Sequence, residues 1–104
     1  MALHLQPPRW MSRFYPESLW FAPEPSNSVY LTFDDGPVPE VTPWVLETLE
    51  RYQARATFFC VGNNIVQYPE IYQQITDRGH SIGNHTMHHV KGFKTPWKMY
   101  VKDV

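Results

Sequence analysis

The chain has 104 residues, of which 42% are hydrophobic and 15% aromatic, a composition typical of one globular domain. Its 9 lysines and arginines against 10 acidic residues leave a formal net charge of -1, so no basic surface for nucleic acid or an anionic membrane is expected. No run approaches the ~20 apolar residues of a membrane span, and the start "MALHLQPPRW" lacks the basic and apolar regions of a signal peptide. We therefore expect neither a membrane span nor a signal peptide in this sequence, and the sequence does not indicate a cellular compartment.

Residues 1–28 carry five of the ten prolines and five large aromatic residues, without a helical or strand period. Proline disfavours regular structure, whereas so many aromatic side chains disfavour free disorder. We therefore expect an extended arm over residues 1–28 that packs on the rest of the chain or on another chain. Residues 29–104 form the domain proper.

Three apolar runs in this domain predict β-strands: "VYLTF" from residue 29, "ATFFCV" from residue 56 and "HSIGN" from residue 80. A helix is expected in each gap, from "EVTPWVLETLERYQ" and from "YPEIYQQITDRG", and "KTPWKMYVKDV" predicts the start of a third. Strands that alternate with helices are typical of a parallel sheet. The predicted fold class is therefore α/β, with a βαβαβ order.

Side chains within these elements have predicted roles of their own. We expect Thr42 to be the N-cap of the first helix, with Pro43 at its first helical position, and Gly79 to end the second helix. Four residues form the predicted apolar face of the first helix: Val45, Leu46, Leu49 and Tyr52. The single cysteine, Cys60, lies in an apolar run and is interpreted as a small core residue.

Two adjacent aspartates, Asp34 and Asp35, end the first predicted strand in the stretch "VYLTFDDGPVP". Burying either carboxylate there would be costly, and Gly36 and Pro37 turn the backbone at once. The carboxyl ends of parallel strands lie at one rim of a sheet, which is where α/β proteins place their sites. The aspartates are therefore expected beside "GNHTMHH", the stretch that ends the third strand.

The histidines of "GNHTMHH" have the spacing of metal ligands. His85 and His89 are four residues apart, so on one turn of helix they would face the same way, and His88 could replace His89 at the shorter spacing. Two imidazoles with one carboxylate make a tridentate site for a divalent metal, and the second carboxylate can serve as a base. His80, at the start of the third strand, is interpreted as structural.

The stretches "TFDDGP" and "HTMHH" resemble the first two motifs of the polysaccharide deacetylase family, carbohydrate esterase family 4. "ATFFCVGNN" and "ITDRGHSIGNH" are similar to its second and third strand regions, so the resemblance covers about residues 28 to 93. It implies a distorted (β/α) barrel that hydrolyses N- or O-acetyl groups on polysaccharides such as peptidoglycan, chitin or xylan. The implied cofactor is Zn²⁺, with Co²⁺, Mn²⁺ or Ni²⁺ as alternatives.

Carried onto this sequence, the resemblance implies that Asp34 is the general base and that Asp35, His85 and His89 hold the metal, which selects His89 over His88. Thr86 matches a hydroxyl position that steadies the loop.

The family's later motifs supply an arginine, a backbone amide for the oxyanion and a histidine acid, and none is identifiable before Val104. The sequence therefore resembles the amino-terminal part of a deacetylase barrel. We expect the isolated chain to be inactive and to self-associate. The alternative is a non-catalytic remnant that binds metal or glycan.

Overall fold

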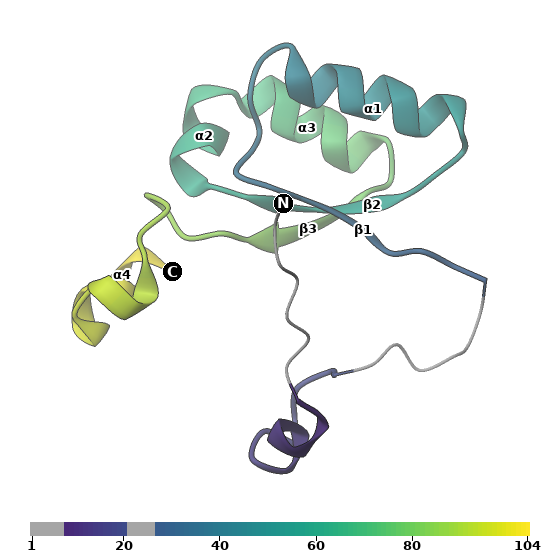
Figure 1. Ribbon diagram of the computed structural model, residues 1–104. Coiled ribbons are helices and arrows are strands. Elements are labelled where there is room, and N and C mark those ends of the chain that lie inside the picture. The colour runs from purple at the N-terminus through teal and green to yellow at the C-terminus, as the bar shows by residue number, and fades with distance from the viewer. Residues whose placement is uncertain (1–7, 21–26) are drawn as a thin grey trace.

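A parallel sheet forms the centre of the computed structural model, which describes residues 8–20 and 27–104. Its 3 strands lie in the order β1-β2-β3 (Figure 1). They are β1 (Leu31–Asp34), β2 (Ala56–Cys60) and β3 (Ser81–Asn84). The helices are η1 (Arg9–Arg13), α1 (Val41–Arg51), α2 (Gly62–Gln67), α3 (Pro69–Asp77), η2 (Gly92–Lys94) and α4 (Trp97–Asp103), where η marks a 3-10 helix. The predicted α/β class and βαβαβ order are therefore confirmed.

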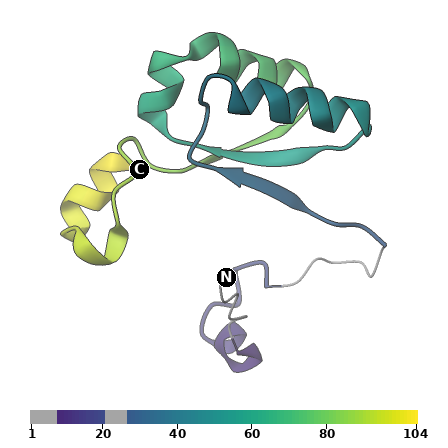
Figure 2. The same ribbon diagram turned by 45° about the horizontal axis from the view of Figure 1, so that its top comes forward.

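The two faces of the sheet differ in what covers them. In register, Phe58 of β2 lies beside Phe33 of β1 and Ile82 of β3, and these apolar side chains pack on the side of α1 and α3. Figures 1 and 2 show both helices on this one face. Side chains alternate along a strand, so Thr57 and its neighbours Thr32 and Ser81 lie on the opposite face, which no helix of the described residues covers in either view.

The winding of the chain is that of a barrel rather than of a doubly wound sheet. Each crossover, through α1 and then through α3, adds the next strand on the same side, so the spatial order equals the chain order. Right-handed crossovers that advance in one direction place all their helices on one face of the sheet. A doubly wound sheet reverses direction and has helices on both faces.

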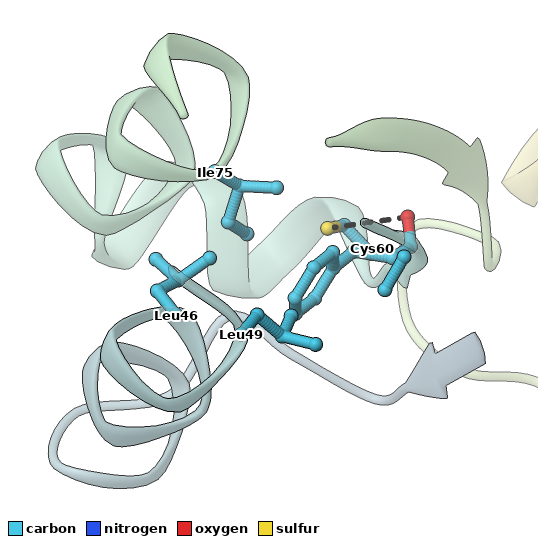
Figure 3. Close-up of a cluster of buried hydrophobic side chains, with 6 residues drawn as sticks. Leu46, Leu49, Cys60 and Ile75 are labelled. Atoms are coloured by element: carbon cyan, nitrogen blue, oxygen red, sulfur yellow. Dashed lines mark hydrogen bonds between the residues drawn. The ribbon is translucent and has the colours of Figure 1, made fainter. Parts of the chain in front are cut away.

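The hydrophobic core lies between the helices and the covered face of the sheet (Figure 3). Leu46 and Leu49 project from α1, Ile75 projects from α3, and Leu46 and Ile75 are fully buried. Phe58 and Cys60 reach the same cluster from β2, and the Cys60 Sγ lies 3.7 Å from the Phe58 carbonyl oxygen. Burial raises the pKa of the Cys60 thiol, so it is a neutral core group, as the sequence predicts.

The start of α1 differs from the prediction. The helix begins at Val41 with Glu40 as its N-cap, so Thr42 lies inside the first turn. Its hydroxyl accepts a hydrogen bond of 2.9 Å from the Val38 amide in the preceding turn, which is why it does not cap the helix. Pro43 is therefore the third helical residue, which costs no hydrogen bond because the first four helical amides have no partner within the helix.

The remaining elements agree with the sequence predictions only in part. Tyr52 is 74% exposed and lies after the end of α1, so the prediction that it joins the apolar face is wrong. The short helix α2 was not predicted. Pro69 begins α3, and Gly79, at φ +77°, follows its C-cap as predicted. The helix expected near the end of the sequence is confirmed as α4.

His80 is a structural residue, as predicted. Its ring is buried against Phe58, and its Nδ1 accepts a hydrogen bond of 3.3 Å from the Ala56 amide at the start of β2. Burial lowers the pKa of His80, and the nearby guanidinium groups of Arg55 and Arg78 lower it further. The neutral form of the ring therefore holds the strands β2 and β3 together at their amino ends.

The predicted arm is described only in part, because residues 1–7 and 21–26 lie outside the described residues. Within residues 8–20, Trp10 of the 3-10 helix η1 and Phe14 at its C-cap meet edge to face, yet they are 59% and 70% exposed. They are therefore not buried on the rest of the chain, and packing on another chain stays a prediction. Across residues 8–20 and 27–104, no helix has both the length and the apolar character that a membrane span requires.

Candidate metal centre

The turn after β1 sets the direction of one carboxylate. Asp35 has a left-handed backbone with φ +69°, which is uncommon for a residue other than glycine. Two contacts hold this turn: the Asn64 side-chain amide donates to the Asp35 carbonyl at 2.7 Å, and the Val61 amide donates to the Gly36 carbonyl at 2.8 Å. The Gly36–Pro37 peptide bond is cis. The turn is therefore fastened to the segment that follows β2.

The loop after β3 is fastened to the same segment. The His85 amide donates to the Cys60 carbonyl at 3.1 Å, and the Gly62 amide donates to the Thr86 carbonyl at 3.0 Å. Gly62 packs closely against this loop, because a Cβ there would lie 2.4 Å from the Met87 sulfur and 3.2 Å from the Met87 Cα and would displace that residue. Since the segment after β2 binds both the aspartate turn and the histidine loop, it brings them to one rim, as the parallel order of the strands predicts.

Three side chains converge at this rim. The Asp35 Oδ1 lies 3.0 Å from the Nε2 of His85 and 3.0 Å from the Nε2 of His89. The two imidazole rings have centroids 5.0 Å apart and are tilted by 42°. Asp35 and His89 border an open cavity of about 350 Å³ that Asn63, Asn64 and His88 also line, so solvent and solutes can reach the cluster.

The chemistry and spacing of this cluster fit a divalent metal. The three candidate ligand atoms lie within 4.8 Å of one another. Two ligands at the usual zinc distances in a tetrahedral site are separated by about 3.3 Å, close to the two separations of 3.0 Å at Asp35. Imidazole nitrogens and a carboxylate oxygen are also the donors that such ions take in hydrolases.

The histidines meet by a different route from the one that their spacing indicated. His85 to Lys91 form an irregular loop, not a helical turn, and Thr86 and His89 have left-handed backbones with φ +63° and +54°. The Thr86 hydroxyl accepts a hydrogen bond of 3.2 Å from the Val90 amide, which closes the loop. The prediction of a shared helix face is therefore wrong, although the loop still brings the two rings together.

The loop separates the two histidines between which the spacing could not choose. His89 lies against Asp35, whereas the His88 ring turns to Asp103 at the end of α4. The His88 Nδ1 lies 2.6 Å from the Asp103 Oδ1, and the His88 amide donates to the Asp103 Oδ2 at 2.8 Å. These hydrogen bonds lower the pKa of the Asp103 carboxyl group.

Asp34 lies next to the cluster without being part of it. It is the last residue of β1, and side chains alternate, so it lies on the face opposite Phe33, which packs partly buried against the core. This is the uncovered face, which forms the interior in a barrel. The structure thus gives the two adjacent aspartates different surroundings.

Two side chains at the site were not singled out from the sequence, namely Asn64 and Asp103. Asn64 follows β2 within "GNN", so its place after the central strand was a usable signal. Asp103 lies 15 residues beyond His88 in sequence, and no local pattern connects the two.

Comparisons with known proteins agree with this architecture. Residues 22–102 match the sequence model of the family described as polysaccharide deacetylase. Over 71 residues the chain is 45% identical to a peptidoglycan-N-acetylglucosamine deacetylase of Bacillus cereus, covering 68% of this chain and 33% of that protein. Over 63 residues it is 52% identical to a chitooligosaccharide deacetylase of Azorhizobium caulinodans, covering 61% and 30%.

The fold agrees as well. The structure of the peptidoglycan deacetylase PdaC from Bacillus subtilis superposes with a TM-score of 0.71 at 35% identity, over 78% of this chain and 41% of that one. The chain spans about a third of the length of the two curated relatives. Because the family model covers most of the chain, including Asp34, Asp35, His85 and His89, this protein belongs to the polysaccharide deacetylase family, carbohydrate esterase family 4.

Proposed function

We propose that this chain provides the metal-binding part of a hydrolase that removes acetyl groups from N-acetylated polysaccharide. The observation that carries the proposal is the convergence of Asp35, His85 and His89 at the rim of the sheet, with donor atoms within 4.8 Å. Membership of the family supports the reaction class.

Each residue of the proposed site would have its own role in the reaction. Asp35, His85 and His89 would hold the metal, for which Zn²⁺ is the leading candidate and Co²⁺, Mn²⁺ and Ni²⁺ are alternatives. A divalent ion supplies Lewis acidity, which polarises a carbonyl group and makes water a better nucleophile at neutral pH. Asp34 would take the proton from the attacking water as general base.

The proposed substrate carries N-acetylglucosamine. One relative is named for peptidoglycan N-acetylglucosamine and another for chitooligosaccharide, and both substrates contain this sugar. The open cavity beside His89 and Asn63 gives a sugar chain access to the cluster without passing through a closed channel. We therefore propose an acetamido group as the reacting group.

Zinc binding tests the proposed site. The purified chain is expected to bind about one Zn²⁺ per molecule, as measured by titration against a chromogenic chelator and by elemental analysis. His85→Ala should remove most of this binding, because it deletes one of the three ligands. Glu47→Ala, which removes an exposed carboxylate on α1, serves as the matched control and should bind like the unmodified chain. Equal stoichiometry in the His85 variant would contradict the site.

A second candidate is a non-catalytic protein that binds metal or glycan. In the described part of the chain, His80 is buried and His88 is paired with Asp103, so neither is free to act as a general acid. We expect slow or undetectable release of acetate from acetylated chitooligosaccharides by the isolated chain, because a missing acid costs about 10²-fold or more. Release of acetate at ordinary enzyme rates would exclude the non-catalytic alternative.

A further inference from the structure

The loop of residues 85–91, which carries His85 and His89, is called the metal loop below. Helix α4 is attached to it by Asp103, the last residue of the helix. Both oxygens of Asp103 bind one residue of the loop: Oδ2 accepts from the His88 amide at 2.8 Å, and Oδ1 lies 2.6 Å from the His88 Nδ1. The Asp103 carbonyl accepts a third hydrogen bond, of 2.6 Å, from the Met87 amide. Since two of these contacts involve backbone amides, they fix the path of the loop itself.

The position of this attachment makes it relevant to the metal ligands. Met87 and His88 lie between His85 and His89, the two histidines of the cluster. Thr86 and His89 have left-handed backbones, which residues other than glycine adopt only when their surroundings hold them there. Asp103 therefore binds the loop at its midpoint, between two strained positions.

Apolar packing does not explain how α4 is held. None of its residues is buried, and Trp97, Met99 and Val101 are 71%, 63% and 64% exposed. The Asp103 side chain, by contrast, is only 13% exposed, although it is a carboxylate. The contact with the loop is thus a principal attachment of the helix, and the burial of Asp103 follows from it.

We propose that Asp103 is a positioning residue of the metal centre: through His88 it holds the loop in the conformation that directs His89 toward Asp35. The same contact turns the His88 ring away from the cluster, so that His88 does not replace His89 as a ligand. This proposal rests on the proposed metal site, because it assigns Asp103 an effect on metal binding.

Zinc and cobalt binding to the whole chain test this role. Groups that orient metal ligands commonly change affinity by about 10- to 100-fold when they are removed, and we expect Asp103→Ala to weaken Zn²⁺ binding by about tenfold. Asp103→Asn keeps an oxygen for the His88 amide and should recover part of the loss. Lys102→Ala, the neighbouring exposed residue of α4, is the control and should bind zinc like the unmodified chain. The absorption spectrum of bound Co²⁺ should also change in Asp103→Ala, because the ligand geometry changes.

A double-mutant cycle separates positioning from general stability. If Asp103 acts through His88, then His88→Ala, which removes the ring contact but keeps the amide contact, should weaken zinc binding by less than Asp103→Ala, and the double variant should be no weaker than Asp103→Ala alone. A merely structural role would lower the midpoint of thermal unfolding of the metal-free chain while leaving zinc affinity and the cobalt spectrum unchanged at 25 °C. That result, with His85→Ala still abolishing binding, would overturn the positioning role alone. Absence of zinc binding by the unmodified chain would overturn both the site and this inference.

Discussion

Neighbouring aspartates have different surroundings at the end of β1 because the backbone changes direction between them. Asp34 still belongs to the strand and lies on its uncovered face, whereas Asp35 has φ +69° and contacts the two histidines. A left-handed residue other than glycine is costly, by about 1 kcal/mol or more. The hydrogen bond from Asn64 to the Asp35 carbonyl offsets part of that cost and fixes the direction of the carboxylate.

Exchange of each carboxylate for an amide separates the proposed roles of the two aspartates. Asp35→Asn should weaken Zn²⁺ binding by about tenfold or more, because a neutral amide oxygen is a poorer ligand for a divalent ion. Asp34→Asn should bind zinc like the unmodified chain, since Asp34 is not among the converging ligands. Isothermal titration with zinc measures both. The reverse pattern would exchange the assigned roles.

His80 gives the stability of the chain a predictable pH dependence. Its pKa in the folded chain lies below the ordinary value of about 6.5, chiefly because it is buried. Between those two pKa values the unfolded chain binds more protons, so the free energy of unfolding rises with pH. The contribution of His80 is therefore fully present above pH ~6.5 and is lost as the pH falls through the folded pKa.

A variant without a titratable ring tests this dependence. His80→Asn retains an oxygen that can accept from the Ala56 amide, so it keeps the hydrogen bond and removes the titration. Urea unfolding at several values between pH 5 and 7.5 should show a smaller decline toward acid for His80→Asn than for the unmodified chain. Parallel curves would show that His80 titrates equally in both states.

The role of a single residue could be predicted where it depends on neighbouring residues in the sequence. It could not be predicted where it depends on contacts with distant residues. Cys60 could be recognised as a core residue from the apolar run around it, and His80 as a structural residue from its place at the start of a strand. Threonine is a common N-cap, but the Thr42 hydroxyl accepts a hydrogen bond from the Val38 amide instead of capping the helix. This alternative hydrogen bond depends on the conformation of the preceding turn. The direction of the His88 ring depends on Asp103, which only the folded chain brings near.

At the scale of elements, β2 and the segment after it organise the molecule. The strand pairs with both neighbours, and it contributes Phe58 and Cys60 to the core. The next residues bind both site-bearing loops through backbone hydrogen bonds. The βαβαβ order was predictable from apolar periodicity, whereas α2 was not, because six residues of "GNNIVQ" show no complete helical period.

The hydrophobic core joins α1, α3 and β2. Leu46 is fully buried in this core, so Leu46→Ala should lower the free energy of unfolding by about 2–5 kcal/mol through lost burial and the cavity that remains. Trp44→Ala removes a larger side chain from the same helix, but Trp44 is 63% exposed and its loss should cost much less. Urea denaturation monitored by circular dichroism measures both. A greater loss for Trp44→Ala would place the core elsewhere.

In the whole molecule, the two faces of the sheet differ in how far they are covered. Helices cover one face, and the other presents Thr32, Thr57, Phe59 and Ser81, with no covering helix or strand among the elements that the structure describes (Figures 1 and 2). Phe59 lies directly over Gly83, where a Cβ would come within 2.3 Å of its ring. Within the described residues, β1 and β3 also form the two edges of the sheet, and unpaired edges favour association.

Self-association should follow from this arrangement, and we propose that the uncovered face is where it occurs. Apolar side chains near β1, including Val29 and Tyr30 at 83% and 72% exposed, add surface that favours burial by another chain. Sedimentation equilibrium should therefore give a mass above the 12.3 kDa of one chain, rising with concentration. Thr57→Lys places a charge in the middle of this face and should shift the chain toward the monomer, because burying an unpaired ammonium group is costly. Gln67→Lys adds the same charge at the exposed end of α2 and should leave the mass unchanged. A monomer at all concentrations would contradict association, and dissociation by both variants alike would show that net charge, not the uncovered face, controls it.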